Sequence, residues 1–215
     1  MPRKKDAPTP PQDLRDACVE AAREVIAAHG VENLSLRDVA RRLGVSHQAP
    51  YRHYPSRDHL LAEVMRRCFE RFAAFLDARG THEEPRQDLE ALGRQYMSFA
   101  QANPLEYRLM FSTPWPQAAE HPDLARDATH TFDILRRVLH RVHGVRAKRE
   151  AVDLDALYIW STLHGLAGVM NGNCIGQLAL SARVHQKAVE HAMSMVDRGL
   201  FSREAMSIQN APIAR

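Results

Sequence analysis

Two short helical patterns separated by a very tight turn constrain the fold of this chain more than any other feature. Apolar residues recur at three- and four-residue steps in the first pattern, at Leu36, Val39, Ala40 and Leu43. Ser35 is a good N-cap for this helix, and Gly44 is a typical stop. Only Val45 separates Gly44 from Ser46, the next N-cap. Two helices joined by so short a glycine-containing turn form a helix-turn-helix.

Helical periodicity also covers most of the remaining chain, and the sequence has no β pattern. The other helices are predicted at about residues 13–29, 56–79, 85–103, 105–111, 123–142, 147–171 and 182–198. The predicted fold class is therefore all-α, with an N-terminal three-helix helix-turn-helix domain over residues 12–57 and a C-terminal helical domain over residues 58–200. The Pro-rich, basic leader at residues 1–11 is expected to be disordered, and the tail at residues 201–215 is expected to fray.

One residue conflicts with a regular helix in the second half of the motif. Pro50 falls at about the fourth position after Ser46, where its ring opposes a helical hydrogen bond. The sequence leaves two possibilities, a helix that opens with a distorted turn or one that begins a residue later.

Basic charge is concentrated in the first quarter of the chain. Residues 1–57 contain ten Lys and Arg against seven Asp and Glu, which accounts for the whole net charge of +3. Within residues 35–57, Asp38 is the one acid against five arginines, at positions Arg37, Arg41, Arg42, Arg52 and Arg57. Such a local excess is typical of a surface that faces phosphates, although a solvated helical face has the same composition.

The second helix of such a motif lies in the major groove of DNA, with its first residues at base edges. We therefore predict that DNA is contacted by Ser35, Arg37, Ser46, His47, Gln48, Tyr51, Arg52, His53, Tyr54 and Arg57. Gln48 can pair with adenine through two hydrogen bonds, and Arg52 can pair with guanine or with a phosphate. Ser35 and Ser46 are expected to bring helix N-termini close to the DNA backbone.

The segment 26–61 resembles the DNA-binding domain of TetR-type transcriptional regulators. The resemblance rests on the glycine-turned helix pair and on the exit Tyr51-Arg52-His53-Tyr54-Pro55-Ser56-Arg57-Asp58-His59-Leu60. It implies binding of double-stranded operator DNA, with Arg57 in place of the usual phosphate-binding Lys. Gln48-Ala49-Pro50 departs from the more common small-Thr-Leu stretch, so the family does not predict the operator sequence. A helix-turn-helix that mediates only protein contacts is the alternative.

The second half of the chain carries another resemblance. Trp160-Ser161-Thr162-Leu163-His164-Gly165 and Asn103-Pro104-Leu105-Glu106-Tyr107-Arg108-Leu109-Met110-Phe111 look like the Trp-x-x-x-His-Gly subset of TetR-family C-terminal domains. This resemblance implies a domain that encloses a small molecule and forms a homodimer through its last two helices. Gly165, Gly168 and Gly172 are compatible with such an interface, because glycine lets another helix approach closely.

Aromatic and methionine residues provide the candidate effector site. The predicted ligand-binding residues are Tyr96, Phe99, Tyr107, Met110, Phe111, Trp160 and His164, and ordinary core packing is the alternative. The predicted function is a repressor that binds a palindromic operator as a dimer and is released by a small apolar or aromatic effector. There are two alternatives. One is a transcriptional activator, and the other is an all-helical ligand carrier or enzyme without DNA binding.

The sequence gives no indication of a metal site, a cofactor or catalytic residues. The widely spaced cysteines Cys18, Cys68 and Cys174 form no C-x-x-C motif, and neither Cys nor a carboxylate completes a site with His140 and His143. The motifs G-x-S-x-G and H-E-x-x-H are absent. The apolar run at residues 156–170 is shorter than the roughly 18 to 20 residues of a membrane span, and no signal peptide is recognisable, so a cytoplasmic protein without a membrane partner is expected.

Overall fold

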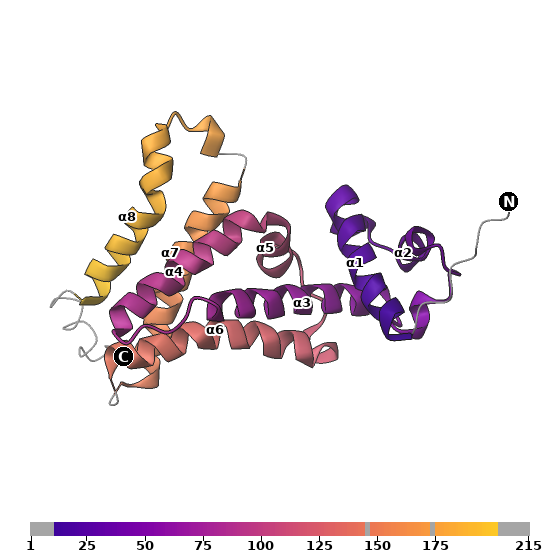
Figure 1. Ribbon diagram of the computed structural model, residues 1–215, viewed down its shortest axis with the longest axis horizontal. Helices are drawn as coiled ribbons and strands as arrows, with labels where there is room; N and C mark the ends of the chain where they lie inside the picture. Colours follow the sequence, from indigo (N-terminus) through magenta and orange to yellow (C-terminus); the bar gives the residue numbers. More distant parts are fainter. Residues whose placement is uncertain (1–10, 145–146, 173–174, 202–215) are drawn as a thin grey trace, which may run out of the picture. The chain divides into compact units, whose positions relative to one another are not determined.

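The computed structural model describes residues 11–144, 147–172 and 175–201, and every regular element in these ranges is helical (Figure 1). The α-helices are α1 (Pro11–His29), α2 (Leu36–Leu43), α3 (Arg57–Asp77), α4 (Pro85–Ala102), α5 (Pro104–Phe111), α6 (Pro122–His143), α7 (Arg149–Asn171) and α8 (Ala182–Phe201). Short 3₁₀ segments are η1 (Val31–Asn33), η2 (Pro50–Arg52), η3 (Ala118–Glu120) and η4 (Ile175–Gln177). The all-α prediction is confirmed. The expected disordered leader at residues 1–11 and frayed tail at residues 201–215 lie outside the described ranges, except for Pro11, the first residue of α1, and Phe201, the last residue of α8.

The start and end of α2 follow from its capping residues. The hydroxyl of Ser35 accepts a hydrogen bond from the backbone N–H of Asp38 at 3.1 Å, which satisfies one of the free amides of the first turn. Gly44 then adopts a left-handed conformation with φ of 67°, and its N–H bonds back to the helix. Each signal lies in the sequence directly beside the helix end that it determines, which explains why the predicted bounds of this helix are confirmed.

The second half of the helix-turn-helix differs from the helix predicted after Ser46. The chain makes turns of the i→i−3 type there: the N–H of Ala49 donates to Ser46 O at 3.0 Å, and the N–H of His53 donates to Pro50 O at 3.0 Å. Pro50 has no N–H to donate to Ser46 O, so an α-helical bond is impossible at this point. The segment is a turn followed by the 3₁₀ segment η2, so neither form of the predicted α-helix is present there.

The described residues divide into two compact units. The first comprises the described parts of residues 1–70 and 108–128, and the second comprises those of residues 71–107 and 129–215. These units group the chain differently from the domains 12–57 and 58–200 proposed from sequence. The reason lies in α3, because its first half contributes the fully buried Leu60, Val64 and Met65 to the first unit.

In the second unit, α4 packs against α7 and α8. Gly93 of α4 permits this packing, because a Cβ atom at this position would lie 2.5 Å from the sulfur of Met193 in α8. The buried carboxylate of Asp88, also on α4, binds the guanidinium groups of Arg79 and Arg141. Among the described helices, none is both long enough and apolar enough to cross a membrane.

Candidate nucleic-acid interface and buried polar cluster

A surface hollow of about 480 Å³ in the first unit is lined by four side chains, Arg37, His47, Gln48 and Tyr51. All four are exposed, and all four belong to the set predicted to contact DNA. Arg37 comes from the first turn of α2, whereas the other three come from the turn and the 3₁₀ segment that follow. The structure therefore brings the start of α2 and the recognition segment (residues 46–53) together on one surface.

The other predicted DNA contacts differ in how accessible they are. Ser46 and Arg52 are exposed, and His53 is half-buried. The hydroxyl of Ser35 donates to the carboxylate of Asp38 at 2.6 Å in addition to capping α2, so it is occupied within the helix. This hydrogen bond is the main reason why the pKa of the Asp38 carboxyl lies below its usual range. The contribution of Ser35 is thus to fix the N-terminus of α2.

Tyr54 corrects the sequence-based set, because only 3% of this residue is exposed. Its hydroxyl donates to the backbone carbonyl of Arg15 in α1 at 3.2 Å. Burial raises the pKa of Tyr54, which keeps the phenol protonated as the donor in this bond. Tyr54 therefore fastens the exit of the motif to α1 and does not present its hydroxyl to DNA.

Arg57 is also occupied by contacts within the chain. Its Nε donates to Leu34 O at 3.1 Å and its Nη2 donates to Val31 O at 2.6 Å. Its Nη1 donates to the carboxylate of Asp58 at 3.0 Å. The guanidinium thus ties the start of α3 to the segment between α1 and α2, a positioning contact that spacing along the sequence does not indicate.

We expect Arg57→Ala to lower the free energy of unfolding by about 1–3 kcal/mol, because two carbonyls lose a charged donor. Arg41→Ala is the matched control, since the Arg41 side chain is 77% exposed and pairs only within α2, with Asp38. Urea denaturation of both variants measures the difference. Equal, small losses in the two variants would show that the bonds of Arg57 contribute nothing to stability.

Four polar side chains meet in the second unit: Tyr96 of α4 and Tyr107 of α5, which are buried, and Trp160 and His164 of α7, which are half-buried. We call these four residues the buried polar cluster. The hydroxyls of Tyr96 and Tyr107 are 2.8 Å apart, and the hydroxyl of Tyr107 lies 2.6 Å from His164 Nδ1. Trp160 hydrogen-bonds to Tyr96. The structure thus brings together four of the seven predicted ligand-binding residues.

Burial keeps this polar cluster uncharged near neutral pH. It raises the pKa of Tyr107 to about 12, and it raises the pKa of Tyr96 further. Burial also lowers the pKa of His164, so the imidazole is neutral at pH 7. The cluster is therefore a set of neutral hydrogen-bonding groups in an apolar surrounding.

Aromatic rings surround the cluster. Phe72 contacts the rings of both Tyr96 and Phe99, with centroids 5.5 Å and 4.8 Å apart, and Phe132 packs edge-on against Trp160 at 6.0 Å. Sequence reasoning missed Phe72 and Phe132. Phe72 lies on the buried face of α3, whereas Phe132 is half-buried on α6. Of the predicted set, Met110 and Phe111 fall in the first unit, where Phe111 packs against Phe69 and Met110 O accepts a bond from Trp115.

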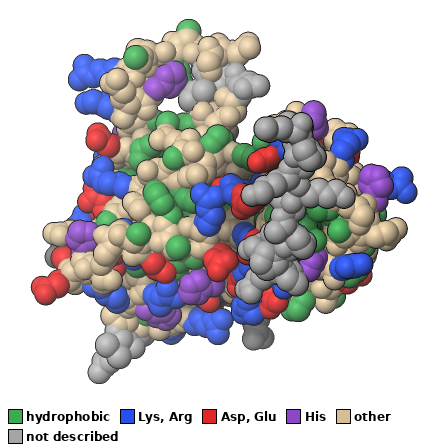
Figure 2. Space-filling model, turned by 45° about the vertical axis from the view of Figure 1, so that its right-hand side comes forward, with side chains coloured by type: hydrophobic (Ala, Val, Ile, Leu, Met, Phe, Trp, Pro, Cys, Tyr) green, Lys and Arg blue, Asp and Glu red, His purple; other side chains and the backbone are tan. Residues whose placement is uncertain are grey.

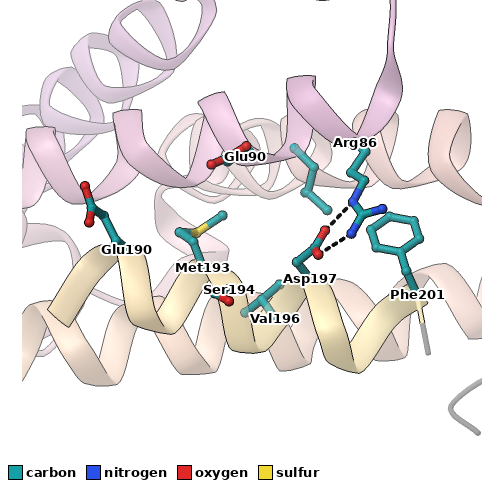
Figure 3. Close-up of a pocket in the computed structure, with 9 residues that line it drawn as sticks. Arg86, Glu90, Glu190, Met193, Ser194, Val196, Asp197 and Phe201 are labelled. Atoms are coloured by element: carbon teal, nitrogen blue, oxygen red, sulfur yellow. Dashed lines mark hydrogen bonds and ion pairs between the residues drawn. The ribbon is translucent and has the colours of Figure 1, made fainter. Parts of the chain in front are cut away.

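A second hollow, of about 350 Å³, lies between α4 and α8 in the second unit (Figure 3). Figure 3 shows Arg86 at one end, bound to the carboxylate of Asp197, with the ring of Phe201 4.6 Å from the guanidinium carbon. Glu90 and Glu190 lie toward the other end. The ion pair of Arg86 and Asp197 joins α4 to α8 at this end of the hollow.

Two family models match the chain. The model described as "Bacterial regulatory proteins, tetR family" matches residues 19–64, and the one described as "Tetracyclin repressor-like, C-terminal domain" matches residues 89–196, half of the chain. The chain belongs to the TetR family. The members of this family are helix-turn-helix transcription regulators and not enzymes. The description of the C-terminal model does not specify the Trp-x-x-x-His-Gly subset, so this finer assignment stays a prediction.

Individual relatives of this TetR-family regulator share a quarter to a third of its aligned residues. It is 33% identical over 115 residues to HTH-type transcriptional regulator Rv1816 of Mycobacterium tuberculosis, which covers 52% of this chain and 49% of that protein. It is 26% identical over 161 residues to HTH-type transcriptional activator FasR of Mycolicibacterium smegmatis, covering 70% and 74%. This chain thus spans about half the length of the Mycobacterium tuberculosis regulator that it matches.

A solved structure extends the similarity to nearly the whole fold. A protein of unknown function from Rhodococcus sp. RHA1 matches with a TM-score of 0.71 and 26% identity, covering 92% of this chain and 98% of that one. The helical architecture described for this TetR-family chain is therefore shared along almost its full length.

Proposed function

We propose that this TetR-family regulator is a repressor that binds a palindromic operator as a homodimer and is released by a small apolar or aromatic effector. The observation that carries the DNA-binding part is the exposed hollow of Arg37, His47, Gln48 and Tyr51, within the segment that matches the tetR family model. The proposal specifies three things in turn: the DNA contacts, the dimer interface and the effector site.

The proposed DNA contacts fall into two groups. Arg37, His47, Gln48 and Tyr51 face base edges, because they line one hollow and their polar tips are exposed. Ser46, Arg52 and His53 contact phosphates at its border, and the N-terminus of α2 that Ser35 caps adds backbone N–H groups. Tyr54 and Arg57 do not contact DNA in this proposal but hold the surface in place. Tyr54 bonds to the backbone of α1, and Arg57 bonds to the backbone of the segment after α1.

The proposed dimer interface uses α7 and α8. Gly165 and Gly168 are exposed on α7, and a Cβ atom on either would meet nothing within 4 Å in this chain. Hydrophobic side chains reach the surface in Figure 2, and those exposed on α7 and α8 include Leu154, Leu157, Val169, Val184 and Met195. Such a face favours a twofold partner, which would cover both glycines. Gly172 ends α7 as its C-cap and so lies at the border of this face.

The proposed effector site is the buried polar cluster with its aromatic walls. Of the seven residues predicted from sequence, the proposed site keeps Tyr96, Phe99, Tyr107, Trp160 and His164. It adds Phe72 and Phe132 from the aromatic walls. The boundary between the two units falls inside α5, between Tyr107 and Arg108. Because a helix moves as a stiff rod, an effector that displaces Tyr107 also displaces the part of α5 that belongs to the first unit, which provides a route from effector to DNA.

An activator of the same family is the second candidate. The observation in its favour is that FasR, 26% identical over 70% of this chain, is a transcriptional activator. Both candidates use the same DNA surface, so the position of the operator relative to a promoter distinguishes them.

Selection of bound duplexes from a random pool tests the proposal. A homodimer with two recognition segments predicts two inverted half-sites with centres about 34–36 Å apart, one turn of DNA or a multiple of it. Affinity for the selected duplex should fall linearly with the logarithm of salt concentration, because binding releases counterions from phosphates. Selection that yields no enriched sequence, or a single half-site, would contradict the proposal.

A further inference from the structure

We propose that the effector of this regulator is an uncharged molecule with a hydroxyl group, and that this hydroxyl inserts between Tyr107 and His164. The inference rests on the proposed function, because it names the class of molecule that the buried polar cluster takes. Three observations support the inference: the direction of the hydrogen bonds in the cluster, the lack of charge on its side chains, and the aromatic rings that surround them.

The hydrogen bonds of the cluster run in one direction. Trp160 has only an indole N–H, so it donates to the hydroxyl of Tyr96. The O–H of Tyr96 then points to the hydroxyl of Tyr107 at 2.8 Å, and the O–H of Tyr107 points to His164 Nδ1 at 2.6 Å. This arrangement gives the indole N–H and both phenol O–H groups an acceptor, and it assigns the imidazole proton of His164 to Nε2.

A group that enters between Tyr107 and His164 must therefore accept on one side and donate on the other. A hydroxyl does both, because it has one O–H and two lone pairs. A carbonyl or carboxylate only accepts, and it would leave His164 Nδ1 with only the more distant hydroxyl of Tyr96, at 3.4 Å, as a donor. An ammonium group only donates, and it would leave the O–H of Tyr107 without an acceptor. Either mismatch in a buried site should weaken binding about tenfold or more.

The surroundings of the cluster exclude a charged effector. Both tyrosines and His164 are neutral at pH 7, and the walls are the rings of Phe72, Phe99 and Phe132. A cation does lie near one wall, since the Arg136 guanidinium is 4.7 Å from the Phe132 ring centroid. Arg136 is paired with Asp133 at 2.9 Å and with Asp153 at 2.8 Å, so its charge is already compensated. A charged ligand would lose its hydration without gaining a counterion.

Insertion also explains how such a molecule would act. In the described structure the hydroxyl of Tyr107 is in direct contact with His164, so the inserted group must part α5 from α7. Tyr107 is the last residue of α5 in the second unit, and Arg108 is the first in the other. The hydrogen bond between Tyr107 and His164 is thus the place where the hydroxyl binds and also the contact whose opening displaces α5.

Calorimetry with three probes of one size tests the inference on the full chain: para-tert-butylphenol, para-tert-butyltoluene and para-tert-butylbenzoate. The phenol should bind at least about tenfold more tightly than either analogue. Tyr107→Phe should weaken this preference, since the hydroxyl of the phenol loses its donor and keeps only His164 Nδ1 as a partner. Tyr158→Phe is the matched control, because it removes the hydroxyl of a tyrosine that is 46% exposed on α7, and it should keep the full preference.

Several results would overturn the inference: equal affinity for the phenol and the toluene, tightest binding of the benzoate, no binding of any probe, or a full preference in Tyr107→Phe. Binding of the selected operator duplex is measured on the same samples. Operator binding by both variants shows that they are folded. If the native chain binds operator but lacks the preference for the phenol, only the inference fails, whereas loss of operator binding by the native chain refutes the proposed function itself.

Discussion

Replacing Asp88 with alanine should lower the free energy of unfolding by about 3–5 kcal/mol, the loss expected when one partner of a buried ion pair is removed. Asp88 is only 1% exposed, and its carboxylate binds Arg79 at 3.3 Å and also binds Arg141. The two arginines also bind backbone carbonyls outside α4. Arg141 donates to His82 O at 2.6 Å, and Arg79 donates to Leu76 O at 2.7 Å. Asp88 therefore holds together the end of α3, the loop after it, α4 and α6.

Urea denaturation of Asp88→Ala measures this loss. Glu90→Ala is the control on the same helix, because Glu90 and its partner Arg94 are 51% and 52% exposed. An exposed pair of this kind contributes less than about 1 kcal/mol. A loss for Asp88→Ala as small as that for Glu90→Ala would show that the buried carboxylate does not hold these segments together.

Replacing Gly168 with glutamate should convert the dimer into monomers and weaken operator binding by about 10²–10⁴-fold, the avidity that two linked half-sites provide. A twofold interface repeats every substitution, so two carboxylates would be buried without partners. Gly168 has no neighbour in its own chain that a new side chain would strike. The monomer should accordingly fold normally.

Light scattering measures the mass, and thermal unfolding checks the fold. Ala74→Glu is the control, because Ala74 is exposed on α3, outside the proposed interface, and gains the same charge. This control should remain a dimer with unchanged operator affinity. A dimer of unchanged mass in Gly168→Glu would place the interface on another face.

Local signals in the sequence were sufficient for the eight described α-helices and for most of their ends, but they also predicted a helix after Ser46 that the structure lacks. Ser35 and Gly44 determine the ends of α2 through bonds to residues three or four positions away. Pro50 identified the irregular place in the recognition segment for the same reason. Both predicted outcomes kept an α-helix after Ser46, whereas the structure has a turn and the 3₁₀ segment η2 there.

The candidate sites were predictable only in part, because their contacts join residues far apart in the chain. Tyr54 and Arg57 have the residue types of a DNA-binding exit, yet their partners are backbone carbonyls 39 and 23 to 26 positions away. Nothing in their spacing distinguishes a buried hydroxyl from an exposed one. The cluster of Tyr107 and His164 likewise joins residues 57 positions apart, and only the fold orders its donors and acceptors.

The most direct test of the central claim, that the recognition segment reads operator DNA, is the affinity of Gln48→Ala for two duplexes of equal length. One duplex carries the selected operator and the other a random sequence. The native chain should prefer the operator by at least about 10³-fold. Gln48→Ala should lose about 1–3 kcal/mol on the operator, mainly at one base position, and almost nothing on the random duplex. Equal losses on both duplexes, or equal binding of both by the native chain, would contradict the claim.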